Sequence, residues 1–372
     1  MTTQKVKIGL LQLNPKIGQL PQNIAKATNI LSGAFPSLIL PPSNSDQEFK
    51  PINANGLQEQ PDIIILPELA LTGYNFSSPQ QLEPYLEPTS SGPSTQWAKD
   101  VSLKLGCHTV IGYPEKCVKT QKHYNSAVMV DPRGNVLFNY RKTHLYYSDE
   151  TSGFLENPDR DFSKSAYGPW KSLCNGNIKL NVGICMDLNP YKFEAPFEKY
   201  EFANSCKANG ANLILCPMAW TSSKSPSLIK TEGKEFEALD DQRKKDIIDH
   251  KQSLLLEARS MYDKSGDPIA TNVDLLRKPE FSTLNYWLQR MSPYVNEPNQ
   301  PRSNISRVGF VAGNRIGYEQ GDVLYAGSSS VFVFNGKPIS AETNPSESVE
   351  YYGSLGKAEE GFMMVQIEVD KI

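Results

Sequence analysis

Four short runs of continuous apolar residues constrain the fold of this 372-residue chain most strongly. They are residues 6–13 (VKIGLLQL), 62–66 (DIIIL), 180–188 (LNVGICMDL) and 212–220 (NLILCPMAW). Runs of this length, rich in Ile, Leu and Val, are typical of strands that are covered on both faces of a sheet. We therefore predict a fold in which helices cover at least one sheet.

Helical patterns separate the strands of each pair, over residues 21–34 in the first half and 196–209 in the second. A further helix is predicted over 95–105. Strands alternating with helices favour an α/β fold, because parallel strands need a crossover connection. Hairpins are also predicted, since the turn DPRGN joins apolar segments 126–130 and 136–140. The last predicted strands (307–314, 328–335 and 361–369) are also hairpin-like. Parallel and antiparallel pairs are therefore both expected, and the predicted sheets are mixed.

Two segments interrupt this alternation. Residues 36–60 are rich in Pro, Ser, Asn and Gln, and residues 222–284 begin with a long charged stretch. Both are predicted to be insertions into one domain that spans residues 1–372. Helical periodicity returns at 253–262 and 285–291.

Three reactive side chains follow predicted strands that are far apart in the sequence. They are Glu68, Lys142 and Cys185. Because binding sites in α/β sheets form beyond the carboxyl ends of strands, we expect these side chains to converge. A thiol can act as nucleophile, a carboxylate can carry its proton, and an ammonium can stabilise an oxyanion together with the Met186 N–H. The set predicts a thiol amidase.

Each residue of this set also has a simpler interpretation. Cys185 can be a buried structural cysteine, Glu68 can cap a turn, and Arg141 can replace its neighbour Lys142 as the cation. A Cys–His pair with His144 is a further alternative. Only their convergence in space distinguishes catalysis from these roles.

The overall composition excludes several classes of protein. A net charge of −3 argues against nucleic-acid binding, and no apolar run is long enough to span a membrane. The six cysteines form no C-x-x-C pair, which favours reduced thiols in a cytoplasmic protein. The four histidines lack a zinc-binding spacing, so no metal is predicted. The chain also lacks G-x-S-x-G and nucleotide-binding glycine motifs.

The motifs around the three residues resemble those of the nitrilase superfamily of carbon–nitrogen hydrolases. They are LPELALTGY around Glu68, YRKTHLY around Lys142 and GICMDL around Cys185, supported by DPRGN and by residues 313–329. The resemblance implies a four-layer αββα sandwich with mixed sheets, a Glu–Lys–Cys triad and no cofactor. It also implies a second, supporting glutamate, for which Glu156 is the best positional match and Glu150 the alternative.

Within this superfamily the chain looks most like the fungal amidohydrolases that act on protein N-termini. This resemblance implies deamidation of N-terminal Asn and Gln, which feeds the N-degron pathway. Such substrates carry a free α-ammonium, for which Asp187 is a predicted partner and Asp149 and Glu150 are alternatives. Trp220 is predicted to line the pocket.

Two other functions remain open at this point. One is an amidase of the same superfamily that acts on free small amides, ω-amides or carbamoyl compounds. The other is a binding protein that kept the fold without the activity. The sequence leaves the oligomeric state undetermined.

Overall fold

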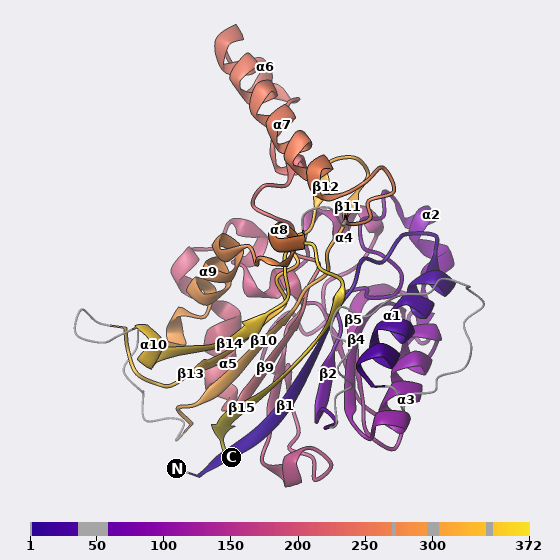
Figure 1. Cartoon of the computed structure of the whole chain (residues 1–372), viewed down its shortest axis with the longest axis vertical. Helices are drawn as coiled ribbons and strands as arrows, with labels where there is room; N and C mark the ends of the chain where they lie inside the picture. The colour runs from indigo at the N-terminus through magenta and orange to yellow at the C-terminus, as the bar shows by residue number, and fades with distance from the viewer. Residues whose placement is uncertain (1, 36–58, 270–272, 296–304, 340–344) are drawn as a thin grey trace.

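The computed structural model describes residues 2–35, 59–269, 273–295, 305–339 and 345–372. Within these ranges two β-sheets pack face to face, and helices cover the outer face of each sheet (Figure 1). This arrangement has four layers, α, β, β and α, and it confirms the predicted fold class.

The first sheet has seven strands. Its order is β15-β1-β2-β4-β5-β6, and the short β3 also pairs with β4. Strands β1, β2 and β4 run parallel, whereas β15, β5 and β6 pair antiparallel, so the sheet is mixed as predicted. The bounds are β1 (Thr3–Gln12), β2 (Ile63–Ile65), β3 (Glu87–Pro88), β4 (His108–Lys116), β5 (His123–Val130), β6 (Val136–Arg141) and β15 (Gly361–Asp370).

The second sheet has six strands, in the order β14-β13-β10-β9-β8-β7. Strands β8, β9 and β10 run parallel at its centre, and the outer strands pair antiparallel. The bounds are β7 (Ala166–Tyr167), β8 (Leu180–Val182), β9 (Leu213–Pro217), β10 (Val308–Gly313), β13 (Ser330–Phe334) and β14 (Val349–Ser354).

The pleat of the first sheet explains why its central strands are apolar throughout. Ile63 and Ile65 of β2 point into the core between the sheets, whereas Ile64 points into a second core on the outer face. Helices α1 (Leu20–Ala34) and α3 (Pro93–Leu105) close that outer core. Both faces of β2 are therefore buried, as a continuous apolar run predicts.

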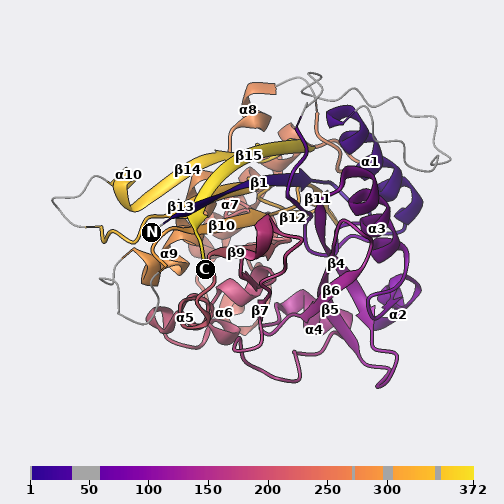
Figure 2. The ribbon, with the colours of Figure 1, turned by 90° about the horizontal axis from the view of Figure 1, so that it is seen from below.

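Helices also cover the outer face of the second sheet. Phe202 and Cys206 of α5 (Glu201–Asn209) and Trp287 of α9 (Phe281–Arg290) join the core of this sheet. Seen from below in Figure 2, α5 and α9 lie on the side opposite to α1 and α3.

Two predicted elements are longer in the sequence pattern than in the structure. The strand predicted over 180–188 ends at Val182, because Cys185 has a left-handed φ of 44° and the backbone turns there. The helix predicted over 196–209 begins only at Glu201, since Tyr200 before it is also left-handed, with φ 44°.

The predicted insertions have different outcomes. Residues 36–58 of the first insertion lie outside the described residues. In the second, the charged stretch and the following periodic segment form one long helix, α7 (Asp241–Met261), which extends away from both sheets (Figure 1). Its buried residues, Leu254, Ala258 and Met261, all lie in its second half. That these segments are insertions into one domain stays a prediction.

The remaining elements are short. They are α2 (Pro79–Leu82), α4 (Tyr147–Ser152), α6 (Lys234–Glu237), α8 (Val273–Arg277), α10 (Pro345–Ser348) and the ladder of β11 (Tyr318–Glu319) with β12 (Val323–Leu324). In the part of the chain that the structure describes, none of the helices combines the length and apolar character of a membrane span.

Candidate active site

The carboxyl ends of strands from both sheets meet at one place. Glu68 follows β2, and its backbone N–H donates to the Met218 carbonyl, which follows β9, at 3.3 Å. Lys142 directly follows β6, and Cys185 lies three residues beyond β8. The sequence rule for strand ends thus selected the correct edge of the sheets.

Lys142 lies at the centre of a buried ionic cluster. Its Nζ donates to Glu68 Oε1 and to Asp149 Oδ2, each at 2.6 Å. Asn125 Nδ2 bridges the same two carboxylates, at 2.6 Å from Glu68 Oε1 and 2.9 Å from Asp149 Oδ1. All four side chains are buried. The Lys142 ammonium and the Asn125 amide each donate to both carboxylates, so these contacts fix the position of Lys142 in a site that solvent does not reach.

Cys185 approaches this cluster from the other sheet. It begins the short 3-10 helix η3 (Cys185–Leu188), and its left-handed backbone turns the chain out of the direction of β8. The Ala219 N–H donates to Glu68 Oε2 at 2.8 Å and also lies close enough to stabilise a Cys185 thiolate. The thiol interacts electrostatically with both Glu68 and Lys142. The structure therefore brings the three predicted residues together.

Burial and charge set the protonation of this cluster. Burial raises the pKa of Glu68, although Lys142 opposes the effect. Burial also raises the pKa of Cys185, and the nearby Glu68 charge adds to it. For Lys142, burial lowers the pKa, but the charges of Asp149 and Glu68 outweigh it and the net pKa is raised. Lys142 therefore stays cationic, and the thiol keeps its proton until a base takes it.

A cavity of about 380 Å³ opens over Cys185. Aromatic residues form much of its wall, and Cys185 and Met186 line it as well; the aromatic residues are Tyr74, Tyr146, Phe193, Trp220 and Tyr286. The Trp220 ring lies 5.6 Å from the Tyr286 ring, centroid to centroid. Trp220 lies in the cavity wall, where the sequence placed it. Tyr286, on α9, follows the predicted insertion.

Comparisons with known proteins match this geometry. The sequence pattern of the carbon-nitrogen hydrolase family matches residues 7–189. A protein N-terminal amidase of Saccharomyces cerevisiae is 30% identical, over 98% of this chain and 95% of that protein. The chain belongs to the carbon-nitrogen hydrolase family. This confirms the resemblance that the motifs indicated.

Solved structures extend the likeness over the whole fold of this carbon-nitrogen hydrolase. A crystal structure of an N-terminal amidase with an Asn-Glu-Ala peptide is 29% identical, with a TM-score of 0.73 and full coverage of both chains. Another, with a Gln-Val peptide, is 28% identical, with a TM-score of 0.72 and 99% coverage of each chain.

The supporting acid of this carbon-nitrogen hydrolase differs from the predicted one. Glu156 accepts a hydrogen bond from the Tyr191 hydroxyl at 2.6 Å and pairs with Arg160 at 3.5 Å, and neither partner belongs to the cluster. Glu150 is exposed and lies 3.9 Å from Lys192. Asp149 contacts Lys142 instead, so the prediction of Glu156 or Glu150 is corrected.

A local signal in the sequence could have identified Asp149. It lies in the first turn of α4, where its Oδ2 also accepts the Tyr146 N–H at 2.9 Å. An acidic residue at this helix position normally caps the helix. Asp149 also lies only seven residues after Lys142 in the sequence. The shorter Asp side chain suits the site because α4 brings its backbone close to the lysine.

Asp187 occupies a different position from the predicted one. Its carboxylate accepts the Tyr140 hydroxyl at 2.8 Å and the backbone N–H groups of Thr143, His144 and Ile184 at 2.7–2.9 Å. It is fully buried and is not among the residues that line the cavity. Asp187 therefore ties the loop after Lys142 to the loop before Cys185, and its predicted contact with a substrate ammonium is corrected.

The structure also decides between the alternative cations and bases. Arg141 forms a two-point contact with Glu115, at 2.5 and 2.9 Å, and its guanidinium stacks on Tyr124. His144 contacts the Asn189 carbonyl through Nδ1 at 3.0 Å. Neither residue lies in the lining of the cavity. Within the described ranges, no group of three His, Cys, Asp or Glu side chains could hold a metal ion.

Proposed function

We propose that this carbon-nitrogen hydrolase is a thiol amidase that converts N-terminal Asn and Gln residues of polypeptides to Asp and Glu. One observation carries the proposal: the Glu68–Lys142–Asp149 cluster lies beside the Cys185 thiol at the wall of a small cavity. The likeness to N-terminal amidases over the full chain supports the same substrate class.

The reaction follows from the positions of these groups. Glu68 accepts the Cys185 proton, and the sulfur attacks the side-chain carbonyl carbon of the amide. Lys142 and the Met186 N–H stabilise the oxyanion that forms. The C–N bond breaks, ammonia leaves with the proton from Glu68, and a thioester remains. Water then gives a proton to Glu68 and attacks the thioester. The C–S bond breaks, the peptide leaves with an N-terminal Asp or Glu, and Glu68 returns the proton to the Cys185 sulfur.

The cavity suits the first residue of a polypeptide. Its volume of about 380 Å³ matches a small ligand pocket, and five aromatic residues form part of its wall. Aromatic faces attract ammonium groups, at about 0.5–2 kcal/mol for each well-placed contact. Trp220 and Tyr286 thus offer the substrate α-ammonium a favourable surface in place of the carboxylate predicted from the sequence.

The cellular role follows from the product. Conversion of an N-terminal amide to an acid changes the charge at the one position that N-degron recognition reads. We propose that the enzyme acts in the cytoplasm and feeds the N-degron pathway.

Matched peptides test the substrate class. We expect peptides that begin with Asn or Gln to gain the mass difference between OH and NH₂, whereas their N-acetylated forms stay unchanged. The acetyl group removes the positive charge that the aromatic wall attracts. Mass spectrometry of timed reactions measures both. Equal rates for free and acetylated peptides, or faster turnover of free small amides, would instead support the alternative superfamily amidase.

The raised pKa of Glu68 predicts how kcat/KM decreases at low pH. Glu68 must be ionised to accept the thiol proton, and its folded-state pKa lies above the ordinary value of 4.5. We therefore expect kcat/KM for an Asn peptide to fall, as pH decreases, at a pH above 4.5. Circular dichroism over the same range controls for acid unfolding. A midpoint at or below 4.5 in a folded enzyme would contradict the role of Glu68 as the base.

A further inference from the structure

The active-site cavity continues into two further cavities along the surface. A second cavity, of about 350 Å³, shares Tyr74, Tyr146 and Thr221 with the first. A third, of about 940 Å³, shares Gln320 with the second. Shared lining residues make the three cavities neighbours, so they form a series from Cys185 to the third cavity. We refer to this series as the path.

The first boundary on this path carries a buried hydroxyl group, that of Tyr74. Tyr74 is 4% exposed and lines both the first and second cavities. Its hydroxyl makes no hydrogen bond of ordinary geometry within the described residues, although the Ser148 side chain interacts with it. A ligand that supplies a well-placed hydrogen bond to this buried hydroxyl is therefore favoured. A peptide backbone passing this point carries both donors and acceptors.

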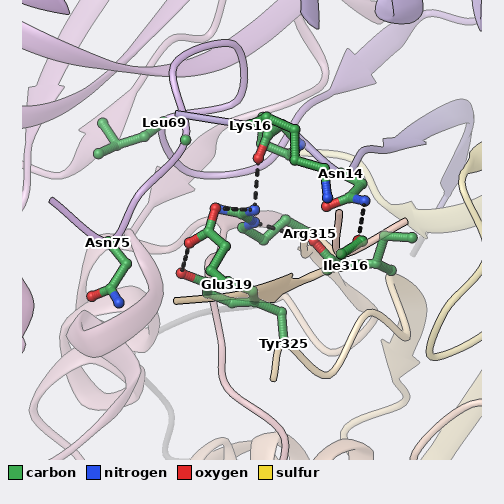
Figure 3. A network of polar contacts seen from close by, with 12 residues as sticks. Asn14, Lys16, Leu69, Asn75, Arg315, Ile316, Glu319 and Tyr325 are labelled. Carbon is green, nitrogen blue, oxygen red and sulfur yellow. Dashed lines mark hydrogen bonds and ion pairs between the residues drawn. The ribbon is translucent and has the colours of Figure 1, made fainter. Parts of the chain in front are cut away.

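The second boundary is an exposed polar contact between Asn75 and Gln320. Asn75 Nδ2 donates to Gln320 Oε1 at 2.9 Å, and Gln320 Nε2 donates back to the Asn75 carbonyl at 2.6 Å. Beside it, Glu319 of the third cavity binds Tyr325 of the second, at 2.8 Å between Oε2 and the hydroxyl (Figure 3). These contacts join the wall of the second cavity to that of the third.

The third cavity carries unbalanced positive charge. Lys16, Arg259 and Lys264 line it. The carboxylate of Glu319, which also lines it, is neutralised by the buried Arg315 at 2.7 Å (Figure 3). Arg259 and Lys264 are exposed, and neither forms an ion pair within the described part of the chain.

An acid, Asp263, also lines this cavity and offsets the charge of one of its cations. Asp263 Oδ1 accepts the backbone N–H groups of Ser265 and Asp267 and the Ser265 hydroxyl. Lys16 lies 3.4 Å from Asp267, so its charge is partly balanced. The lining therefore holds three cations against two carboxylates, an excess of one positive charge. Arg259 and Lys264 are the exposed cations among them, and they are the ones that an acidic ligand reaches.

We propose that residues 2–4 of the substrate polypeptide follow this path, and that Arg259 and Lys264 favour acidic residues at positions 3 and 4. The inference rests on the proposed function, because it assigns the part of the substrate beyond the deamidated residue. An extended chain advances about 3.3–3.6 Å per residue, so a polypeptide must leave the first cavity within a residue or two. The shared walls at Tyr74 and Tyr146 give it a direction.

A charge series of peptides tests the path. The peptides are Asn-Gly-X-X-Ala-Tyr, with X as Glu, Gln or Lys. We expect kcat/KM to follow the order Glu, Gln, Lys, with about a 10-fold difference between the ends, because exposed ion pairs are individually weak. High salt should reduce this difference, since both charges are exposed.

A charge reversal provides the decisive variant. Arg259→Glu with Lys264→Glu should invert the order of the peptides, so that the Lys peptide reacts fastest and the Glu peptide slowest. The matched control is Lys119→Glu with Lys122→Glu, which changes the net charge equally at exposed positions outside the three cavities. The control should keep the original order.

The possible outcomes distinguish failure of the proposed peptide path from failure of the proposed amidase function. Equal rates for the three peptides, or an order that survives the Arg259→Glu, Lys264→Glu change, would overturn the path to the third cavity. The proposed function would stand in that case, because all three peptides would still be deamidated. No turnover of any peptide in the series would contradict the proposed function itself.

Discussion

Replacement of Cys185 by alanine is expected to abolish formation of the thioester and to lower kcat by about 10⁵–10⁶-fold, the loss typical of deleting a nucleophile that works as a unit with its base. The sulfur is the atom that attacks the amide carbonyl, and alanine offers no substitute. An acid-quenched reaction with an Asn peptide, followed by intact-protein mass spectrometry, should show an adduct of peptide minus ammonia in the native enzyme only.

A second buried cysteine provides the control for this change. Cys206, on α5, lies in the core and outside the lining of the cavity. Cys206→Ala should keep the adduct and most of the activity, with a modest loss of stability from the small void. An adduct that persists in Cys185→Ala, or disappears in Cys206→Ala, would show that the nucleophile was assigned to the wrong sulfur.

Replacement of Asp149 by asparagine is expected to damage both stability and activity. Asp149 is one of two carboxylates that balance the buried charge of Lys142. Removing one partner of a buried ion pair costs about 3–5 kcal/mol of unfolding free energy. A displaced Lys142 also stabilises the oxyanion poorly, which should lower kcat by about 10²–10³-fold. Chemical denaturation and steady-state kinetics measure the two effects.

Glu156→Gln is the matched control for this prediction. Glu156 is the position that the resemblance favoured, yet among the described residues its carboxylate pairs with Tyr191 and Arg160 and not with Lys142. Its loss should change the unfolding free energy by about 1 kcal/mol or less and leave kcat near the native value. A larger loss of kcat in Glu156→Gln than in Asp149→Asn would restore the original assignment.

Much of the fold could be predicted because its strands have unambiguous patterns. The run DIIIL becomes β2, and both of its faces are buried, as the absence of polar alternation required. The turn DPRGN joins β5 and β6 as predicted. The pattern failed at residues 180–188, where Cys185 leaves the strand through a left-handed backbone that apolar composition does not reveal.

Some residues of the candidate site could be predicted from the sequence, and others could not. Glu68, Lys142 and Cys185 were identifiable because each follows a strand, and strand ends meet at the same edge. Asp149, Asn125 and the Ala219 N–H were missed, because their roles depend on which side chain reaches Lys142 or Glu68 in three dimensions. Asp187 was misassigned because the sequence does not show which way a carboxylate near the nucleophile points. In the structure it accepts three backbone N–H groups and one hydroxyl instead of facing the cavity.

The sequence by itself determined the alternation of strands and helices, the chemistry of the three reactive side chains and the family, since all three are written in local order and short motifs. Only the tertiary structure decided which acid balances Lys142 and which residues form the aromatic part of the cavity wall. Those features depend on contacts between segments far apart in the sequence, such as Glu68 and Ala219, which are 151 residues apart. Such contacts are fixed by packing of the two sheets, and no local pattern encodes them.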